Sequence, residues 1–437
     1  MEDPVLYGEF RRQLKAVQIA IRVHGASNNS FTDKYCQGNP HQAPYSIEVR
    51  SDAISLVQDK PLKQWTFLLP EGLRALPGSC SGLEWIQGEG IQMRLQLETD
   101  DDLDGAQEAE PEKRGELDEE TGDLFLKALE DPSCEVSCSR CGAPLVQPSG
   151  GFKKVLPLPS GDWGDMAADM WCCKSKVIAE ERGKMSPLQL NPEEGSIMVD
   201  DLHLLINSRM LTKGSVQIEV KKMTGLSNTK RTGKSFNVLC QRCGHILGSI
   251  NNSGGSSQLE TTKLYRYAVC IQHKRNHLSD KMSNPLQQTI CSVMVSLFKN
   301  QMTFKYIIED EEEHKPRLLI WLLGIDTRLL FGGAPSIIKD QAGSLSPSQP
   351  SSPIPPEGSR LEVQLKSQPI VKVLYQTCNS DTGQRLGQEW NKDLMVHGIT
   401  LTMEACLQLG LLLATSTLQA PPSMRQMNGF RVGSLKL

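Results

Sequence analysis

The chain lacks any apolar run of the length that a membrane span requires, which is about 18 residues. Its start, Met1 to Tyr7, contains two acidic residues and no apolar core, so a secretory signal is not expected. We therefore predict a protein without membrane contact, located in the cytoplasm, with the nucleus as a second compartment.

The chain also lacks a basic excess. Its 437 residues carry a formal net charge of -4, whereas general nucleic-acid binding usually shows as a surplus of lysine and arginine. No GxxxxGK[ST] phosphate loop, no HExxH motif and no GxGxxG after a strand occurs. Direct nucleic-acid binding and the common nucleotide, metalloprotease and dinucleotide chemistries are therefore not expected.

Cysteine, by contrast, is plentiful, with 13 residues. Disulfides are rare in compartments that keep thiols reduced, and an odd number of cysteines cannot all form pairs within one chain. The cysteines are therefore poor evidence for disulfides. Metal binding or reactivity explains some of these cysteines better, and the others are expected to be small buried hydrophobes.

Two cysteine pairs form the same element twice. Cys138-Ser-Arg-Cys141-Gly and Cys240-Gln-Arg-Cys243-Gly each place two thiols three residues apart and follow them with glycine. Two such knuckles complete a tetrahedral four-cysteine shell for one zinc ion, and four thiolates leave no open position for catalysis. We therefore predict a structural zinc site. The alternatives are four unrelated buried cysteines, His245 as a substitute ligand, or Cys134 in place of Cys138.

Between the knuckles lies a segment rich in proline and tryptophan, from Val155-Leu-Pro-Leu-Pro-Ser160 to Trp171-Cys172-Cys173. Adjacent cysteines cannot easily chelate one ion together, but either thiolate can be presented outward as a single ligand. Residue chemistry alone favours a proline-rich crossover whose tryptophans pack on the zinc knuckles.

Cys406 is a third candidate functional cysteine, as a reactive thiol. It lies near the start of a predicted apolar helix that Thr402 can cap and that runs to about Leu413. A helix N-terminus stabilises a thiolate and lowers its pKa, as thioester chemistry requires. A buried helix residue is the alternative. His397 is only a weak candidate base, and no Ser-His-Asp or Cys-His-Asn arrangement is legible.

The predicted fold class is α+β, with several regions along the chain. They are a mainly-β, sandwich-like or barrel-like N-terminal module at 1–99, an acidic flexible insertion at 100–123, a β-rich zinc-stapled region with the Trp-Cys-Cys segment at 124–258, and a mixed α/β C-terminal region at 259–437 with a disordered linker at 343–359.

Local patterns also predict individual elements. Strands are expected where apolar residues alternate, and a helix where they recur every three or four residues. The main expectations are a hairpin turning at 88–90, a strand at 264–271, a helix beginning at Asn284-Pro285, a hairpin tip at 309–313, and a second hairpin formed by 361–365 and 371–375.

Together these segments resemble the HECT-like ubiquitin ligases that bind ubiquitin-conjugating enzymes. The resemblance is carried by the Pro-Leu-Pro and Trp-Cys-Cys segment, by both knuckles, and by the segments Ile320-Trp-Leu-Leu323, Val371-Lys-Val-Leu-Tyr375 and 397–413. It runs from about Leu129 to the C-terminus, and weaker similarity covers the N-terminal β-region.

The resemblance implies an E3 ubiquitin-protein transferase that accepts ubiquitin from a conjugating enzyme and passes it to substrates, promoting their proteasomal degradation. The implied partners are ubiquitin, a ubiquitin-conjugating enzyme bound at about Gln272 to Val293, and cyclin-type or other protein substrates. Cys406 would carry the thioester. The family pattern there is Thr-Cys-x-x-x-Leu-x-Leu, and Ala405 stands in place of its threonine.

The resemblance implies a second function as well. The Trp-Cys-Cys segment is similar to a motif by which certain proteins insert a cysteine into a metallo-β-lactamase-type RNA endonuclease of pre-mRNA 3′-end processing. Cys173, or its neighbour Cys172, would then ligate the partner's zinc and inhibit the nuclease. A third hypothesis is a scaffold that holds a conjugating enzyme near substrates and needs no nucleophile.

Overall fold

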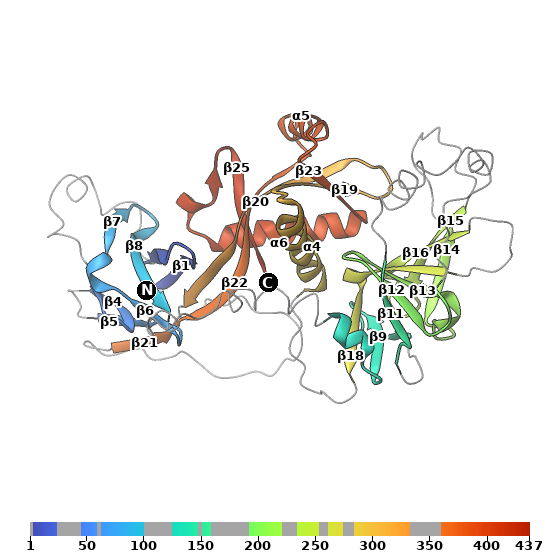
Figure 1. The fold of residues 1–437 in the computed structure, drawn as a ribbon. Coiled ribbons are helices and arrows are strands. Elements are labelled where there is room, and N and C mark those ends of the chain that lie inside the picture. Colours follow the sequence, from blue (N-terminus) through green and yellow to red (C-terminus); the bar gives the residue numbers. More distant parts are fainter. Residues whose placement is uncertain are drawn as a thin grey trace, which may run out of the picture. The chain divides into compact units, whose positions relative to one another are not determined.

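The computed structural model describes residues 3–23, 45–58, 63–99, 125–146, 151–158, 192–220, 234–252, 261–273, 284–332 and 360–437. The insertion predicted at 100–123, the linker predicted at 343–359, and the Cys172-Cys173 pair lie outside these residues. The chain forms two compact units, which we call the first unit (Met1–Ala109, Leu319–Thr377, Gly410–Leu437) and the second unit (Glu110–Leu318, Cys378–Leu409). Strands and helices both contribute, which confirms the α+β class (Figure 1).

The first unit is built on a sheet that joins strands from both ends of the chain. Its order is β24 (Gln426–Met427), β25 (Phe430–Lys436), β22 (Lys366–Thr377), β20 (Pro316–Gly332), β1 (Val5–Arg11), β2 (Ala16–Arg22), β8 (Gly90–Thr99) and β6 (Leu73–Ala75).

The predicted hairpin at 88–90 is confirmed, because β7 (Ser81–Ile86) pairs with β8 and places Ile86 opposite Gly90. Gly90 has φ +108°, and a Cβ atom there would lie 2.2 Å from the carbonyl oxygen of Ile21. Only glycine fits this close approach of two strands.

A second, smaller sheet completes the first unit. Its order is β21 (Arg360–Gln364), β5 (Lys63–Leu68), β4 (Ala53–Gln58) and β3 (Tyr45–Val49). Both sheets contribute fully buried apolar side chains to one core, among them Leu6, Phe10, Ile19, Ile54, Phe67 and Leu95. Two sheets around a shared core form a sandwich, which is one of the two arrangements expected for the N-terminal region.

The predicted hairpin of 361–365 and 371–375 is wrong. Strand β21 pairs in parallel with β5, where Leu361 lies opposite Trp65, whereas β22 pairs with β25, where Val373 lies opposite Gly433. Alternation correctly marks both segments as strands. It says which side of a strand is buried, and it does not say which strand lies beside it.

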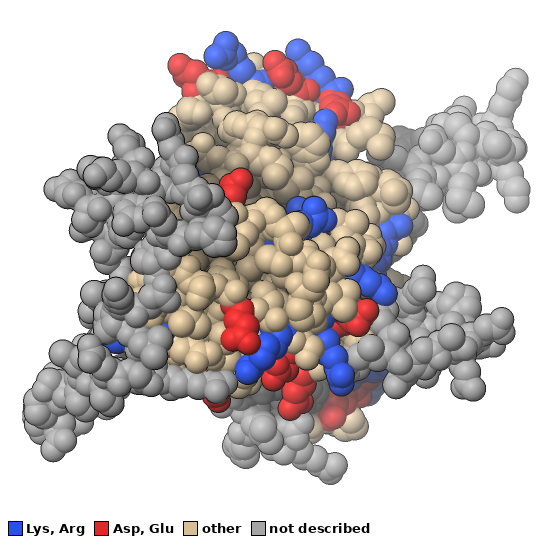
Figure 2. All heavy atoms as spheres, turned by 90° about the vertical axis from the view of Figure 1, so that its left-hand side faces the viewer, with Lys and Arg blue, Asp and Glu red and all other residues tan. Residues whose placement is uncertain are grey.

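One face of the molecule is mixed in charge. Figure 2 shows lysine and arginine side chains interspersed with aspartate and glutamate on one face, with wide uncharged areas between them. The described residues of this face therefore form no single-sign field of the kind that nucleic-acid binding uses.

The second unit contains a larger sheet and a smaller one. The larger has the order β11 (Lys154–Pro157), β12 (Ser196–Val199), β13 (His203–Asn207), β17 (Thr261–Tyr265), β16 (Ile246–Asn252), β15 (Lys234–Cys240) and β14 (Val216–Val220). The smaller has the order β10 (Pro144–Val146), β9 (Cys134–Cys138) and β18 (Val269–His273). Strands β19 (Lys305–Asp310) and β23 (Val396–Leu401) pair in parallel.

Segment 264–271 is not one strand, because the 3-10 turn η6 (Arg266–Ala268) divides β17 from β18. This turn lets one continuous segment contribute a strand to each of the two sheets.

The helices begin where the capping signals predicted. For α4 (Pro285–Gln301), the Asn284 side chain accepts a hydrogen bond from the Leu286 N–H at 3.1 Å. For α6 (Met403–Gln419), the Thr402 hydroxyl accepts from the Ala405 N–H at 3.3 Å, and the helix continues past the predicted end at Leu413. Among the described residues, no helix is both long and apolar enough to cross a membrane.

Candidate functional site

Both cysteine knuckles fold in the same way. The N–H of the glycine that follows the second cysteine, Gly142 or Gly244, donates to the carbonyl of the first cysteine at 2.8 Å. Each of these glycines has φ +69°. A left-handed residue at this point turns the chain back, so that both thiols of a knuckle face the same side.

The structure brings the four predicted thiols together. Cys138 and Cys243 have their Sγ atoms 3.7 Å apart, and Cys141 and Cys240 have theirs 3.6 Å apart. All four sulfurs lie within 4.8 Å of one another. A tetrahedron with metal–sulfur bonds of about 2.3 Å has sulfur–sulfur edges of about 3.8 Å, so these residues fit a four-thiolate metal site. The His245 imidazole is not part of the cluster.

The cysteine cluster joins the two sheets of the second unit. Cys138 ends β9 of the smaller sheet, and Cys240 ends β15 of the larger sheet. Between these strands in the chain, β11 and β12 lie side by side in parallel, with Pro157 opposite Val199. They flank residues 158–195, which include the Trp-Cys-Cys segment. Parallel neighbours require such a long crossover connection.

The knuckles also contact the start of α6. The Glu404 carboxylate lies 3.5 Å from the guanidinium of Arg140 and 3.7 Å from the imidazole of His245. The Tyr267 side chain, on the turn η6, lies 3.4 Å from the Thr402 hydroxyl, and the Ser139 N–H donates to the Ala268 carbonyl at 3.0 Å. These links between the knuckles and α6 were not apparent in the sequence.

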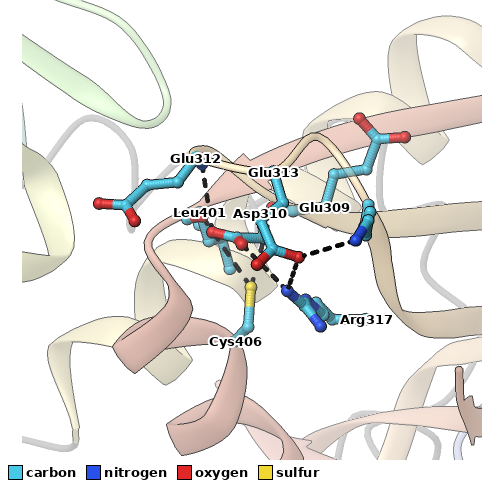
Figure 3. A network of polar contacts seen from close by, with 8 residues as sticks. Glu309, Asp310, Glu312, Glu313, Arg317, Leu401 and Cys406 are labelled. Atoms are coloured by element: carbon cyan, nitrogen blue, oxygen red, sulfur yellow. Dashed lines mark hydrogen bonds and ion pairs between the residues drawn. The ribbon is translucent and has the colours of Figure 1, made fainter. Parts of the chain in front are cut away.

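Cys406 is buried in the first turn of α6, with 3% of its surface exposed. Its thiol points toward two backbone carbonyls, of Glu309 at 3.7 Å and of Leu401 at 3.9 Å (Figure 3). Burial raises the pKa of this thiol to about 12, and the nearby Asp310 carboxylate adds to the effect. The expected lowering of the pKa by the helix N-terminus is therefore wrong, because loss of water outweighs the helix dipole.

An ion pair that the sequence did not suggest lies beside Cys406. The Arg317 guanidinium donates to the carboxylate of Asp310 at 3.1 Å and to that of Glu313 at 2.8 Å (Figure 3). Asp310 is 2% exposed, and its other oxygen accepts from the Glu312 N–H at 3.2 Å. These bonds hold the turn at 310–315, which is the predicted hairpin tip.

The Cys406 thiol is expected to resist alkylation in the native protein. With a pKa near 12 instead of 9, its thiolate fraction at pH 8 is about a thousandfold smaller, and the fraction rises tenfold per pH unit until pH approaches 12. Iodoacetamide at pH 8, followed by peptide mass spectrometry, should label the exposed Cys80 and leave Cys406 unlabelled until denaturant is added. Equal native labelling of both cysteines would contradict this expectation.

The predicted stretch for binding a conjugating enzyme, Gln272 to Val293, is described only at its ends. Its C-terminal part is the first half of α4, where Leu286, Ile290 and Val293 are buried. The described part therefore faces the core of the protein. Whether Cys172 or Cys173 serves as a ligand for a partner's zinc stays a prediction.

Comparison with known proteins places these features in context. Residues 9–432 match the profile of a family described as HECT-like, ubiquitin-conjugating enzyme (E2)-binding. No solved structure matches the chain.

Several curated relatives that carry the name E3 ubiquitin-protein ligase E3D are similar over almost the whole chain. The mouse protein (Mus musculus) is 29% identical over 403 residues, which are 92% of this chain and 93% of that protein. The human protein (Homo sapiens) is 26% identical over 408 residues, which are 92% of this chain and 94% of that protein.

Proposed function

This chain belongs to the HECT-like family that binds ubiquitin-conjugating enzymes (E2), and we propose that it is an E3 ubiquitin-protein ligase. In this role it binds an E2 charged with ubiquitin and promotes transfer of ubiquitin to lysines of substrate proteins, which are then degraded by the proteasome. The observation that carries the proposal is the family match over residues 9–432, which extends through both compact units.

We propose further that the four clustered cysteines bind one zinc ion. Their sulfur–sulfur separations suit zinc, and thiolates are its preferred ligands in structural sites. The zinc ion, when bound, supplies a cross-link and no reactive position. The residues around it, Glu404 and Arg140 among them, connect this cross-link to the start of α6.

For the transfer step, the geometry supports the scaffold hypothesis over a thioester at Cys406. A substrate amine attacks the thioester carbonyl on the conjugating enzyme, a C–N bond forms, and the C–S bond breaks to release the enzyme's own thiol. The ligase then contributes binding and orientation. A relay through Cys406 would require the first turn of α6 to open, because the thiol is buried and protonated at neutral pH.

Reconstituted ubiquitination with Cys406→Ala is the direct test. Alanine keeps the site apolar, so we expect a ligase rate within about twofold of the wild type and no ubiquitin adduct that reducing agent removes. Cys378→Ala, at another buried cysteine of the second unit, is the matched control. A reducible adduct in the wild type that is lost only in Cys406→Ala would show a thioester relay instead.

The second candidate function is inhibition of a metallo-β-lactamase-type endonuclease of pre-mRNA 3′-end processing through Cys173. One observation supports it: both ends of the segment that contains Cys173 are held in the larger sheet, where the Lys153 N–H donates to the Gly195 carbonyl and the Leu158 N–H to the Val199 carbonyl, each at 2.8 Å. These bonds fix where the chain leaves the sheet before Cys173 and where it re-enters the sheet after Cys173.

This candidate predicts that Cys173→Ala abolishes inhibition of the purified nuclease and leaves the thermal unfolding of the protein unchanged. Cys172→Ala is the neighbouring control and should inhibit like the wild type. Unaltered inhibition by Cys173→Ala would rule out the zinc-ligand mechanism.

A further inference from the structure

Four large apolar side chains are exposed together at one end of the β19–β23 pair. They are Met302 (57% exposed), Phe304 (42%), Leu394 (100%) and Met395 (63%), and we call them the apolar end cluster. Because Lys305 lies opposite Val396 in the parallel pair, the residues just before each strand, Phe304 and Met395, lie side by side. Grouped exposed apolar residues of this kind usually mark an interaction site.

The turn that carries Leu394 and Met395 is held by polar contacts. Asp393 accepts a hydrogen bond from the Met395 N–H at 3.0 Å, and its other carboxylate oxygen accepts from the Lys305 ammonium at 3.2 Å. The Asp393 N–H donates to the carbonyl of the buried Trp390 at 3.0 Å. The backbone of this turn is therefore preorganised, so little backbone entropy is lost when a partner binds.

Met302 adds an independent sign of function. It ends α4 with φ 55°, a left-handed conformation for which glycine is the favoured residue. Its side chain is exposed, so the folded protein gains little from keeping methionine here. The neighbouring Phe304 is held by an edge-to-face contact with Phe298, with ring centroids 5.1 Å apart. An unfavourable backbone conformation at an exposed apolar residue points to a binding role.

The charge of the surrounding segments defines the chemistry of the partner. Segments 299–305 and 391–395 contain three lysines, Lys299, Lys305 and Lys392, and one acid, Asp393, whose carboxylate pairs with Lys305. These two segments thus carry a net charge of +2. A partner surface with apolar side chains surrounded by carboxylates would complement them.

We propose that the apolar end cluster is a docking surface for the ubiquitin-conjugating enzyme. This inference rests on the proposed function, since the family is defined by binding such an enzyme. The first half of α4 faces the core, whereas the end of the same helix presents Met302 to solvent. The docking contact that we propose lies beyond the C-terminus of α4 and uses the turn before β23.

The test is binding of the full chain to a panel of purified ubiquitin-conjugating enzymes, measured by biolayer interferometry. Leu394→Ser with Met395→Ser should weaken binding on the order of 30-fold, as expected when central contacts of an interface are lost. Met302→Gly should also weaken binding, while its thermal midpoint stays equal to that of the wild type or rises. This result separates lost contact from misfolding. Leu407→Ser, at an exposed leucine of the same unit, is the control and should bind within about twofold of the wild type.

Each other outcome is distinguishable. If the wild type binds a conjugating enzyme and the Leu394→Ser/Met395→Ser variant binds it equally well, the docking inference is wrong and the proposed function stands. If the wild type binds no member of the panel, the proposed function fails and the inference fails with it. If the variant loses only self-association, measured by light scattering, the cluster joins two copies of this chain and the inference is wrong.

Discussion

A Cys240→Ser substitution is expected to remove metal binding and to unfold the second unit. Cys240 ends β15 in the larger sheet and lies 3.6 Å, sulfur to sulfur, from Cys141 of the other knuckle. Structural zinc contributes roughly 10–16 kcal/mol in small zinc-finger peptides. Whole domains are stable by only about 5–15 kcal/mol. The free energy lost with the ion is therefore expected to exceed the free energy of unfolding of a unit of this kind.

The measurements are zinc content by elemental analysis and hydrogen exchange of the strands that carry the knuckles. The wild type should contain one zinc ion per chain, and Cys240→Ser should contain none and exchange rapidly in β9, β10, β15 and β16. Cys134→Ala is the control, because Cys134 is buried in the same strand as Cys138 but lies outside the metal cluster. Its expected cost is about 1 kcal/mol, with full zinc content. If Cys240→Ser kept its zinc and its protection from hydrogen exchange, the proposed structural role of the zinc ion would be wrong.

A Lys372→Met substitution in the first unit is the second large effect. Lys372 and Glu9 form an ion pair between β22 and β1, and their side chains are only 8% and 5% exposed. Removal of one partner leaves a buried charge without compensation, which costs about 3–5 kcal/mol. At a few degrees per kcal/mol, we expect the thermal midpoint of this unit to fall by about 10 °C.

The double variant distinguishes the energetic contribution of the ion pair from that of side-chain packing. Glu9→Leu with Lys372→Met should recover most of the lost stability, because two apolar side chains replace two charges. The cycle is best measured in a Tyr7→Phe background, since the Tyr7 hydroxyl donates to Glu9 at 2.9 Å and would otherwise lose its acceptor. Asp52→Asn breaks the exposed Arg50–Asp52 pair of the same unit and should cost less than about 1 kcal/mol. A loss in the double variant equal to the sum of the losses in Glu9→Leu and Lys372→Met alone would show that the buried pair has no energetic coupling.

Much of the four-cysteine cluster could be predicted from the sequence, because its signals are local. A knuckle needs two cysteines three apart and a glycine that accepts a positive φ, and these requirements lie within five consecutive residues. The same holds for the start of α4, where Asn284 and Pro285 meet the capping needs of a helix. The Glu404 contacts with the knuckles could not be predicted, because they join residues far apart in the chain.

The predictions of strand pairing and of thiol reactivity were wrong because both properties depend on residues far apart in the chain. The alternation in 361–365 and 371–375 identified two strands, yet β21 joins β5 in one sheet and β22 joins β25 in the other. The helix position of Cys406 suggested a reactive thiol. Packing of α6 against the carbonyls of Glu309 and Leu401 buries it and raises its pKa instead.

The sequence by itself determined the α+β class and the four cysteines that cluster, because periodicity and local spacing encode both, and its resemblance to the HECT-like ligases indicated the family. Only the tertiary structure decided that the first unit combines strands from both ends of the chain, that Cys406 is shielded, and that Met302, Phe304, Leu394 and Met395 form one exposed cluster. The physical reason is that burial and strand pairing arise from contacts between residues far apart in the chain. Periodicity constrains which side of an element is buried, and long-range packing selects what covers it.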